Sequence, residues 1–369
     1  MSGGPVKVAL VFGGRSAEHE VSLRSARSVY EAMDKSRYDV MPVFITLEGT
    51  WYRMPATVAS FDAGSRVNEA DRLVLSQDPS TRGLIRIPKD GAAEVLSVDV
   101  VIPILHGTYG EDGTLQGLLD MADVPYVGCG VLASAVGMDK VFMKAAFRAS
   151  GLEVGPFFWF LRSEWQRDRS PILDRAKKSR LPLFVKPANM GSSVGVSRVD
   201  DLSKFEQAVE LAAKYDRKII VEDGIEGREL EVSVLGNDEP EASVAGEVVS
   251  HSKAQFYDYE EKYLDDTAEL TIPADVPEEV HKKAATVAKE AFKAVDGSGL
   301  GRVDMFLTPD GRAVVNEINT LPGFTSVSMY PKLWEASGLS YSKLIDRLVE
   351  LAIERHSDKQ QTQTCRKDA

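Results

Sequence analysis

The chain has 369 residues, enough for two or three domains with well-formed cores. Its formal net charge of −12 argues against a nucleic-acid-binding or membrane-surface protein, although it does not exclude a locally basic cleft. Two cysteines cannot build a disulfide framework, the N-terminus lacks a secretory signal, and the least polar stretch (124–138) is too short to span a bilayer, so we expect a cytoplasmic protein.

The first third of the chain predicts alternating strands and helices. Apolar runs typical of strands buried in a parallel sheet occur at 6–12, 38–46 and 98–107. A helical pattern lies between the first two runs. This alternation of strands and helix indicates an open, mostly parallel α/β sheet. Ligands of such sheets bind beyond the carboxyl ends of strands, where the polar segments 13–22 and 106–117 fall. Gly13 and Gly14 do not complete a dinucleotide-binding G-x-G-x-x-G pattern.

The rest of the chain alternates differently. Helices are predicted at 139–151, 202–215, 277–295 and 341–356. Strands are predicted at 217–223, 229–236 and 242–249, and as a hairpin over 301–319 with Pro-Asp-Gly at its turn. We expect the tyrosine-rich segment 252–270 to be an ordered loop and residues 357–369 to be a frayed tail.

The predicted hairpin gathers oxygen-bearing side chains. Glu317 and Asn319 are two residues apart on a strand and so point to the same side, and the turn brings Asp304 beside them. A surface polar pair would explain Glu317 and Asn319 alone, but two carboxylates and an amide without counter-charge favour a bound cation. Oxygen ligands suit Mg²⁺, which completes its shell with water and substrate phosphates.

A phosphate cradle is predicted in the glycine-rich segment 186–196, "KPANMGSSVGV". Its backbone N–H groups could face phosphate oxygens, although it lacks the Gly-Lys-Ser/Thr ending of a Walker A loop. For Gly-Ser-Ser alone an ordinary β-hairpin turn would be favoured, but Lys140 and Lys186, each beside an apolar stretch, favour a nucleotide. Glu222 and Glu229 could accept hydrogen bonds from ribose hydroxyls, although solvated charge is the simpler explanation of their spacing.

Six segments resemble, in order, motifs of the D-alanine–D-alanine ligase family of the ATP-grasp superfamily: "GGRSAEHEVSL", "HGTYGEDGTLQG", "MDK", "VKPANMGSSVG", "DYEEKYL" and "NEINTLPGFTSVSMYP". The resemblance covers nearly the whole chain. It implies an α/β, three-domain ATP-grasp fold with an N-terminal open parallel-sheet domain, divided into 1–128, 129–222 and 223–369, with a lid loop at 251–266. It also implies ATP-dependent joining of two D-alanines through a D-alanyl phosphate, for peptidoglycan precursor synthesis. Two Mg²⁺ ions, replaceable by Mn²⁺, and a homodimer are implied as well.

The resemblance also assigns roles to individual residues. Phosphate binding is assigned to Lys140, Lys186, Ser192, Ser193, Val194 and Lys262. The adenine slot is assigned to Phe184, Ile225 and Phe306, with Glu222 accepting from the adenine amine and Glu229 holding the ribose. The metal ions are assigned to Asp304, Glu317 and Asn319. Substrate binding and catalysis are assigned to Glu18, Val21 and His106 at the first D-alanine, to Arg302 and Gly323 at the oxyanion, to Ser328 and Met329 at the second D-alanine, and to Tyr263 in the lid.

Alternatives concern the second substrate and the reaction. D-lactate or D-serine could replace the second D-alanine, but Tyr263, where a histidine would otherwise stand in the lid, resembles the D-alanine-specific branch. A nucleotide-binding module without ligase activity would need no Glu18, Arg302 or Ser328, and a kinase that stops at the acyl phosphate would need no second-substrate residues. The sequence departs from residues common in the family at His19, Met190 and Gly224.

Overall fold

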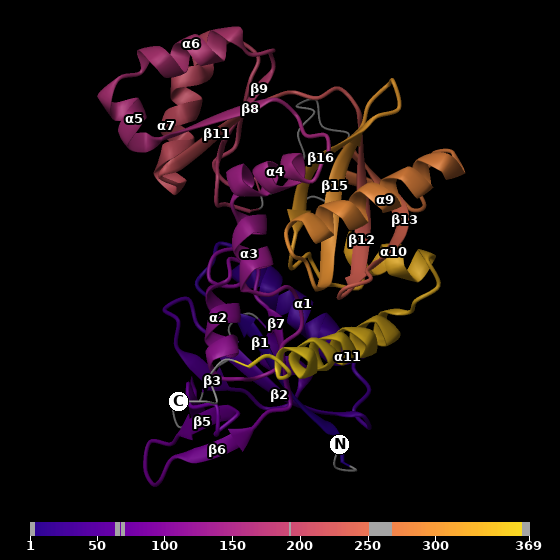
Figure 1. The fold of residues 1–369 in the computed structure, drawn as a ribbon. Helices are drawn as coiled ribbons and strands as arrows, with labels where there is room; N and C mark the ends of the chain where they lie inside the picture. Colours follow the sequence, from indigo (N-terminus) through magenta and orange to yellow (C-terminus); the bar gives the residue numbers. More distant parts are fainter. Residues whose placement is uncertain (1–3, 63–66, 68–70, 192, 251–267, 364–369) are drawn as a thin grey trace.

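The computed structural model describes residues 4–62, 67, 71–191, 193–250 and 268–363. They form three β-sheets, each covered by its own helices (Figure 1). The N-terminal sheet lies at one end of the molecule, and the other two sheets lie at the opposite end on either side of helix α4 (Lys140–Ala149). Within the described ranges, no helix combines the length and the apolar character needed to cross a bilayer.

The N-terminal sheet has seven strands in the order β6-β5-β4-β3-β2-β1-β7. Its parallel part consists of β1 (Val6–Gly13) between β2 (Tyr38–Ile45) and β7 (Val100–Ile104). Four further strands, which the sequence pattern did not reveal, extend the sheet antiparallel: β3 (Trp51–Arg53), β4 (Arg72–Leu75), β5 (Gly83–Ile87) and β6 (Glu94–Ser97). The expectation of a mostly parallel sheet is therefore correct only for β2-β1-β7, because short turns such as β4–β5 join neighbours antiparallel, whereas parallel pairing needs a long crossover.

Helices cover both faces of this sheet. One apolar core combines β1 and β7 with α1 (His19–Ala32) and with the C-terminal helix α11 (Tyr341–Lys359). A second core, on the other face, includes Leu115 and Leu119 of α2 (Thr114–Met121). The last helix of the chain thus packs on the N-terminal sheet, and it continues to Lys359, beyond the predicted start of a frayed tail.

The second sheet is antiparallel with the order β10-β9-β11-β8. Its strands are β8 (Phe157–Leu161), β9 (Leu183–Pro187), β10 (Ser197–Val199) and β11 (Lys218–Asp223). Its helices are α5 (Arg162–Arg167), α6 (Ser170–Lys178) and α7 (Phe205–Tyr215), while α3 (Val131–Met138) and α4 precede it. As predicted, the glycine-rich segment joins two antiparallel strands, β9 and β10.

The third sheet is antiparallel with the order β14-β13-β12-β15-β16. Its strands are β12 (Arg228–Gly236), β13 (Glu241–Ser250), β14 (Ala268–Thr271), β15 (Gly299–Leu307) and β16 (Ala313–Asn319), accompanied by α9 (Glu278–Ala294) and α10 (Met329–Ala336). The predicted hairpin is confirmed as β15–β16. The loop predicted at 252–270 is wrong at its end, where β14 pairs with β13, and its residues 252–267 lie outside the described ranges.

Candidate functional site

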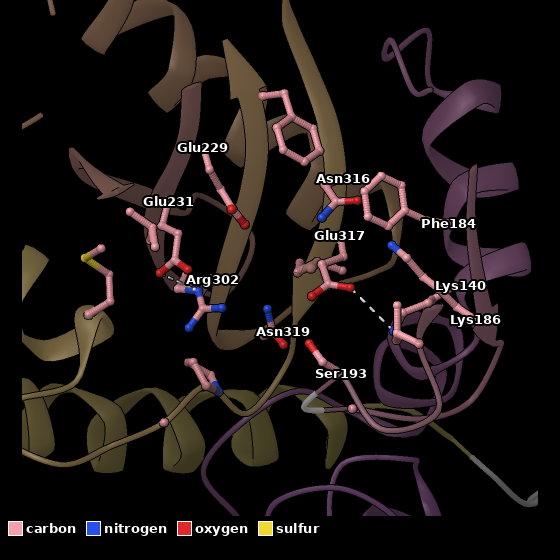
Figure 2. Close-up of a pocket in the computed structure, with 18 of the residues that line it drawn as sticks. Lys140, Phe184, Lys186, Ser193, Glu229, Glu231, Arg302, Asn316, Glu317 and Asn319 are labelled. Atoms are coloured by element: carbon pink, nitrogen blue, oxygen red, sulfur yellow. Dashed lines mark ion pairs between the residues drawn. The ribbon is translucent and has the colours of Figure 1, made fainter. Parts of the chain in front are cut away.

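A cleft of about 1310 Å³ opens between the second and third sheets and reaches the N-terminal sheet. Figure 2 shows Phe184 and Lys186 on one side and Glu229, Arg302 and Glu317 on the other. The predicted site residues that line the cleft are Glu18, Val21, His106, Lys140, Phe184, Lys186, Ser193, Glu222, Ile225, Glu229, Arg302, Phe306, Glu317, Asn319, Gly323, Ser328 and Met329. Asp304 and Val194 are described but are not among the lining residues. Ser192, Lys262, Tyr263 and the lid segment 251–266 lie outside the described residues.

Strand alternation explains which side chains of the third sheet face the cleft. Register pairs Glu229 with Phe306 and Glu231 with Asp304, so these residues share one face. The residues between them, such as Leu230 and Met305, are buried in the core under α9. Polar residues at every second position of adjacent strands thus form the floor of the cleft.

Arg302 is held by two carboxylates. Its Nε lies 2.9 Å from Glu231 Oε2 and 2.7 Å from Asp304 Oδ1. Its Nη2 donates a second hydrogen bond to Asp304, to Oδ2 at 2.7 Å. Asp304 is only 3% exposed, so it lies beneath Arg302 rather than on the cleft wall. Each carboxylate oxygen has two lone pairs, so Oδ1 of Asp304, which accepts one hydrogen bond from Arg302, could also bind a metal ion while it holds Arg302.

The predicted metal-binding side chains are adjacent. Asp304 lies directly opposite Glu317, and Arg302 directly opposite Asn319, on neighbouring strands. Asn319 Nδ2 donates to Asp304 Oδ2 at 3.0 Å, and Lys140 Nζ lies 3.4 Å from Glu317 Oε2. Among the described residues, no group of three or more His, Cys, Asp or Glu side chains is placed to hold a metal, so the amide of Asn319 is needed to complete the set. Two carboxylates and an amide oxygen at the cleft fit a hard cation such as Mg²⁺.

Two lysines, the buried Lys144 and the half-buried Lys186, flank Glu222 in the cleft. Lys186 Nζ lies 2.6 Å from its Oε2 and Lys144 Nζ lies 2.8 Å from its Oε1. Burial would raise the pKa of Glu222, but the two ammonium groups outweigh burial and lower it. Burial opposes the charge on Lys186, yet Glu222 and Glu317 raise its pKa above the ordinary value. Glu222, predicted as an acceptor for the adenine amine, is thus also the counter-ion of both lysines.

The N-terminal domain contributes a pair of carboxylates. Glu18 and Glu111 both line the cleft, and Glu111 Oε1 accepts a hydrogen bond from the Gly107 amide at 2.9 Å. Burial, reinforced by the charge of Glu18, raises the pKa of Glu111 to about 8. The neighbouring His106 is buried, which lowers the pKa of its imidazole. A Cβ built on Gly191 would lie 3.3 Å from Glu18 Oε2, so the glycine-rich loop closely approaches this pair.

A helix N-terminus closes the other end of the cleft. Ser328 is the N-cap residue of α10, and its Oγ accepts a hydrogen bond from the Thr325 amide at 3.1 Å. Gly323 lies beside it, since a Cβ at that position would be 3.3 Å from Ser328 Oγ. Amide groups of a helix N-terminus attract anions, so this end suits a carboxylate.

Among the cleft residues that the sequence interpretation missed, three contact predicted site residues or lie beside them. Lys144 follows Lys140 by four residues, and this spacing on a helix places both side chains on one face. Glu231 follows Glu229 by two residues on a strand, which also predicts a shared face. Glu111 lies in a loop, where no periodicity indicates which way a side chain points.

Comparisons with known proteins match this chain to one family over nearly its whole length. A family model described as D-ala D-ala ligase N-terminus matches residues 7–129, and one described as D-ala D-ala ligase C-terminus matches residues 146–350. D-alanine–D-alanine ligase of Bacillus licheniformis is 46% identical, over 96% of this chain and 98% of the relative. D-alanine–D-alanine ligase A of Salmonella typhimurium is 47% identical, over 95% and 97%.

Two solved structures are similar in fold. The D-alanine–D-alanine ligase from Coxiella burnetii superposes with a TM-score of 0.83 at 38% identity, covering 97% of this chain and 96% of that one. The VanG D-Ala:D-Ser ligase from Enterococcus faecalis has a TM-score of 0.84 at 37% identity, covering 94% and 99%. The fold class predicted from the sequence is confirmed.

Proposed function

Because the chain belongs to the D-alanine–D-alanine ligase family, we propose that it forms D-alanyl-D-alanine from ATP and two D-alanines through a D-alanyl phosphate. Ligation of two D-alanines, which supplies peptidoglycan precursors, follows from the family itself. The reaction course, the cofactors and the residue roles are our proposal. The observation that carries it is one cleft that brings together Lys140, Lys186 and the half-buried Arg302, with a pair of carboxylates at one end and a helix N-terminus at the other.

The first step is transfer of the γ-phosphoryl group. The carboxylate of the first D-alanine attacks the γ-phosphorus, ADP leaves, and an acyl phosphate forms. Lys140 and Lys186 offset the negative charge of the phosphates, and the loop containing Ser193 lies beside them. Bound Mg²⁺, held by Glu317, Asn319 and the remaining lone pair of Asp304, would supply further charge neutralisation. Mn²⁺ has the same ligand preference for oxygen.

The second step forms the peptide bond. The amine of the second D-alanine, after losing a proton, attacks the acyl carbon, and phosphate leaves with one of the former carboxylate oxygens. Arg302 and the amide of Gly323 donate hydrogen bonds to the tetrahedral oxyanion. Glu18 binds the ammonium group of the first D-alanine, and the N-terminus of α10 at Ser328 binds the carboxylate of the second. Val21 and His106 lie at the first site and Met329 at the second.

The nucleotide occupies the space between the second and third sheets. Phe184, Ile225 and Phe306 provide apolar surface for the adenine, and Glu229 provides an acceptor for the ribose. We further propose that the protein works in the cytoplasm as a homodimer. The lid formed by 251–266, with Lys262 and Tyr263, and the phosphate contact of Ser192 stay predictions from the sequence.

D-serine is the best-supported alternative second substrate, because one similar structure is a D-Ala:D-Ser ligase. That structure is 37% identical, however, whereas curated D-alanine–D-alanine ligases reach 47%. The identity difference favours D-alanine. A nucleotide-binding module without ligase activity is not favoured by these relatives.

The test is an assay that measures phosphate release and product mass together. We expect ATP-dependent phosphate release on adding D-alanine, with one D-alanyl-D-alanine formed per phosphate. L-alanine serves as the control and should release no phosphate above background. D-serine or D-lactate should be incorporated poorly when mixed with D-alanine. Phosphate release without dipeptide would contradict the proposal.

A further inference from the structure

The backbone around Glu317 is fixed by side chains of helix α4. Lys144 Nζ donates to the carbonyl oxygen of Asn316 at 2.8 Å, and Met143 Sδ accepts from the amide of Ile318 at 3.4 Å. The peptide groups on both sides of Glu317 are therefore bonded to one helix. Lys140, one turn earlier on the same face, contacts the Glu317 carboxylate itself (Figure 2).

A β-bulge makes this support necessary. Asp304 pairs with Glu317, but the next residue, Met305, pairs with Val315, so Asn316 is an extra residue on β16. A bulged residue is left out of the hydrogen-bond ladder, and its polar groups need other partners. Lys144 supplies that partner for the carbonyl of Asn316. The bulge also sets the direction of Glu317, so the Lys144 contact fixes the orientation of that side chain.

Lys144 also connects the two sheets that enclose the cleft. It is 3% exposed, and its ammonium group lies between the carbonyl of Asn316 on β16 and the carboxylate of Glu222 on β11. Taking a lysine out of water is costly unless its charge and donors are satisfied. Both partners line the nucleotide cleft, one in each of the two sheets that enclose it. The helix α4 thus bridges these sheets through a single buried cation.

We propose that Lys144 is a positioning residue that holds Glu317 in the orientation required to bind the metal ion. The proposal rests on the assignment of Glu317 to the metal. It goes beyond the phosphate role of Lys140, because Lys144 acts through the backbone of its target and needs no contact with ATP.

The chain offers a matched control in a second buried lysine. Lys218 on β11 is 8% exposed and forms an ion pair with Asp139, the N-cap residue of α4. It ties the same helix to the second sheet but does not line the cleft. Lys218→Met therefore removes a comparable buried charge that pairs with the N-cap residue of α4, and it leaves the backbone of Glu317 untouched.

The test measures Mn²⁺ binding to the full chain with saturating ADP, from the electron paramagnetic resonance signal of free Mn²⁺. Because residues that orient metal ligands typically contribute 10–100-fold to affinity, Lys144→Met should raise the Kd by roughly 10-fold. Lys218→Met should stay within about 2-fold, and Glu317→Gln should lose more affinity than Lys144→Met. The KM of Lys144→Met for D-alanine should change little, because neither D-alanine site involves Lys144.

Each outcome is decisive. Wild-type affinity in Lys144→Met, with weakened binding in Glu317→Gln, would overturn the proposal. Wild-type affinity in Glu317→Gln would instead overturn the metal assignment beneath it. Equal losses of Mn²⁺ affinity in Lys144→Met and Lys218→Met would also overturn the proposal, because they would show that any weakening of the packing of α4 has the same effect. If circular dichroism shows that Lys144→Met does not fold, Lys144→Gln takes its place. Its side chain is neutral and one bond shorter than that of lysine, so it cannot reach the Asn316 carbonyl as Lys144 does. Weaker Mn²⁺ binding than wild type then supports the proposal, and unchanged binding overturns it.

Discussion

Arg302 binds both carboxylate oxygens of Asp304, two positions further along the same strand, through two hydrogen bonds of 2.7 Å each. This bidentate contact fixes the plane of the guanidinium group, and Glu231 holds the same group at 2.9 Å. An arginine held from below in this way is preorganised, so it can stabilise an oxyanion without first being ordered.

Replacing Arg302 with lysine keeps the charge but removes the planar fork. We expect kcat to fall by roughly 10²–10³-fold, as for the loss of other oxyanion donors, because the ammonium group cannot bind Asp304 bidentately. Steady-state kinetics with D-alanine and ATP varied separately measure the effect. A rise in the KM for ATP alone, with kcat unchanged, would place Arg302 in the nucleotide site instead.

Replacing Glu222 with glutamine removes the counter-ion of the buried Lys144 and the half-buried Lys186. Breaking a buried ion pair from one side typically costs about 3–5 kcal/mol, because a charge is left uncompensated. We expect Glu222→Gln to lower the free energy of unfolding in urea by at least about 2 kcal/mol, with a raised KM for ATP. Glu226→Gln, in the following loop, is the control and should show no comparable loss. Wild-type stability in Glu222→Gln would show that Lys144 and Lys186 do not depend on this carboxylate.

Glu111 makes the stability of the folded protein depend on pH, and the shift of its pKa predicts whether stability rises or falls with pH. Its pKa is about 8 in the folded protein against an ordinary value of 4.5, because of burial and the nearby Glu18, partly offset by Lys140. Between these values the folded state holds a proton that the unfolded state releases, so stability falls as pH rises. Glu111→Gln removes this dependence. We expect the Tm of the variant, relative to wild type, to be about 2 °C or more higher at pH 9 than at pH 5. A Tm difference that is the same at both pH values would contradict the assignment.

Gly107 is required by both its backbone and its neighbours. Its φ is +75°, and a Cβ would lie 2.6 Å from Ser16 Oγ and 2.8 Å from Glu18 Oε2. Gly107→Ala should therefore displace Glu18 and destabilise the protein by about 1 kcal/mol or more. We expect kcat/KM for D-alanine to fall, while ADP affinity stays close to wild type. Gly91→Ala, also at positive φ (+103°) but with open space around it, separates backbone strain from displacement of Glu18.

The sequence predicted the fold best where periodicity is strong or where the family motifs are distinctive. The helices around α4, α7, α9 and α11 and the β15–β16 hairpin were predicted because their apolar spacing or turn residues are clear. The strands β3 to β6 were missed because they are only three to five residues long, too short for a periodic pattern to stand out. Such short strands are defined by pairing with neighbours, which a single sequence does not display.

For the site, residue types were predictable but their partners were not. The prediction that the turn brings Asp304 beside Glu317 is confirmed, but their direct pairing depends on the bulge at Asn316, which the turn alone does not predict. The ion pairs of Glu222 with Lys144 and Lys186 join three separate elements, so no local pattern could reveal them. Arg302, which lies above Asp304 on the same strand, is likewise contacted by Glu231 from the neighbouring strand β12.

In the proposed reaction, the carboxylate of the first D-alanine attacks the γ-phosphate of ATP. D-alanine labelled with ¹⁸O at both carboxylate oxygens tests this directly, because the released phosphate must then carry one labelled oxygen. Mass spectrometry of the phosphate and of the dipeptide should show one ¹⁸O in each phosphate and one retained at the new amide carbonyl. Phosphate without label, released at the rate of dipeptide formation, would contradict an acyl phosphate and the account of the cleft built on it.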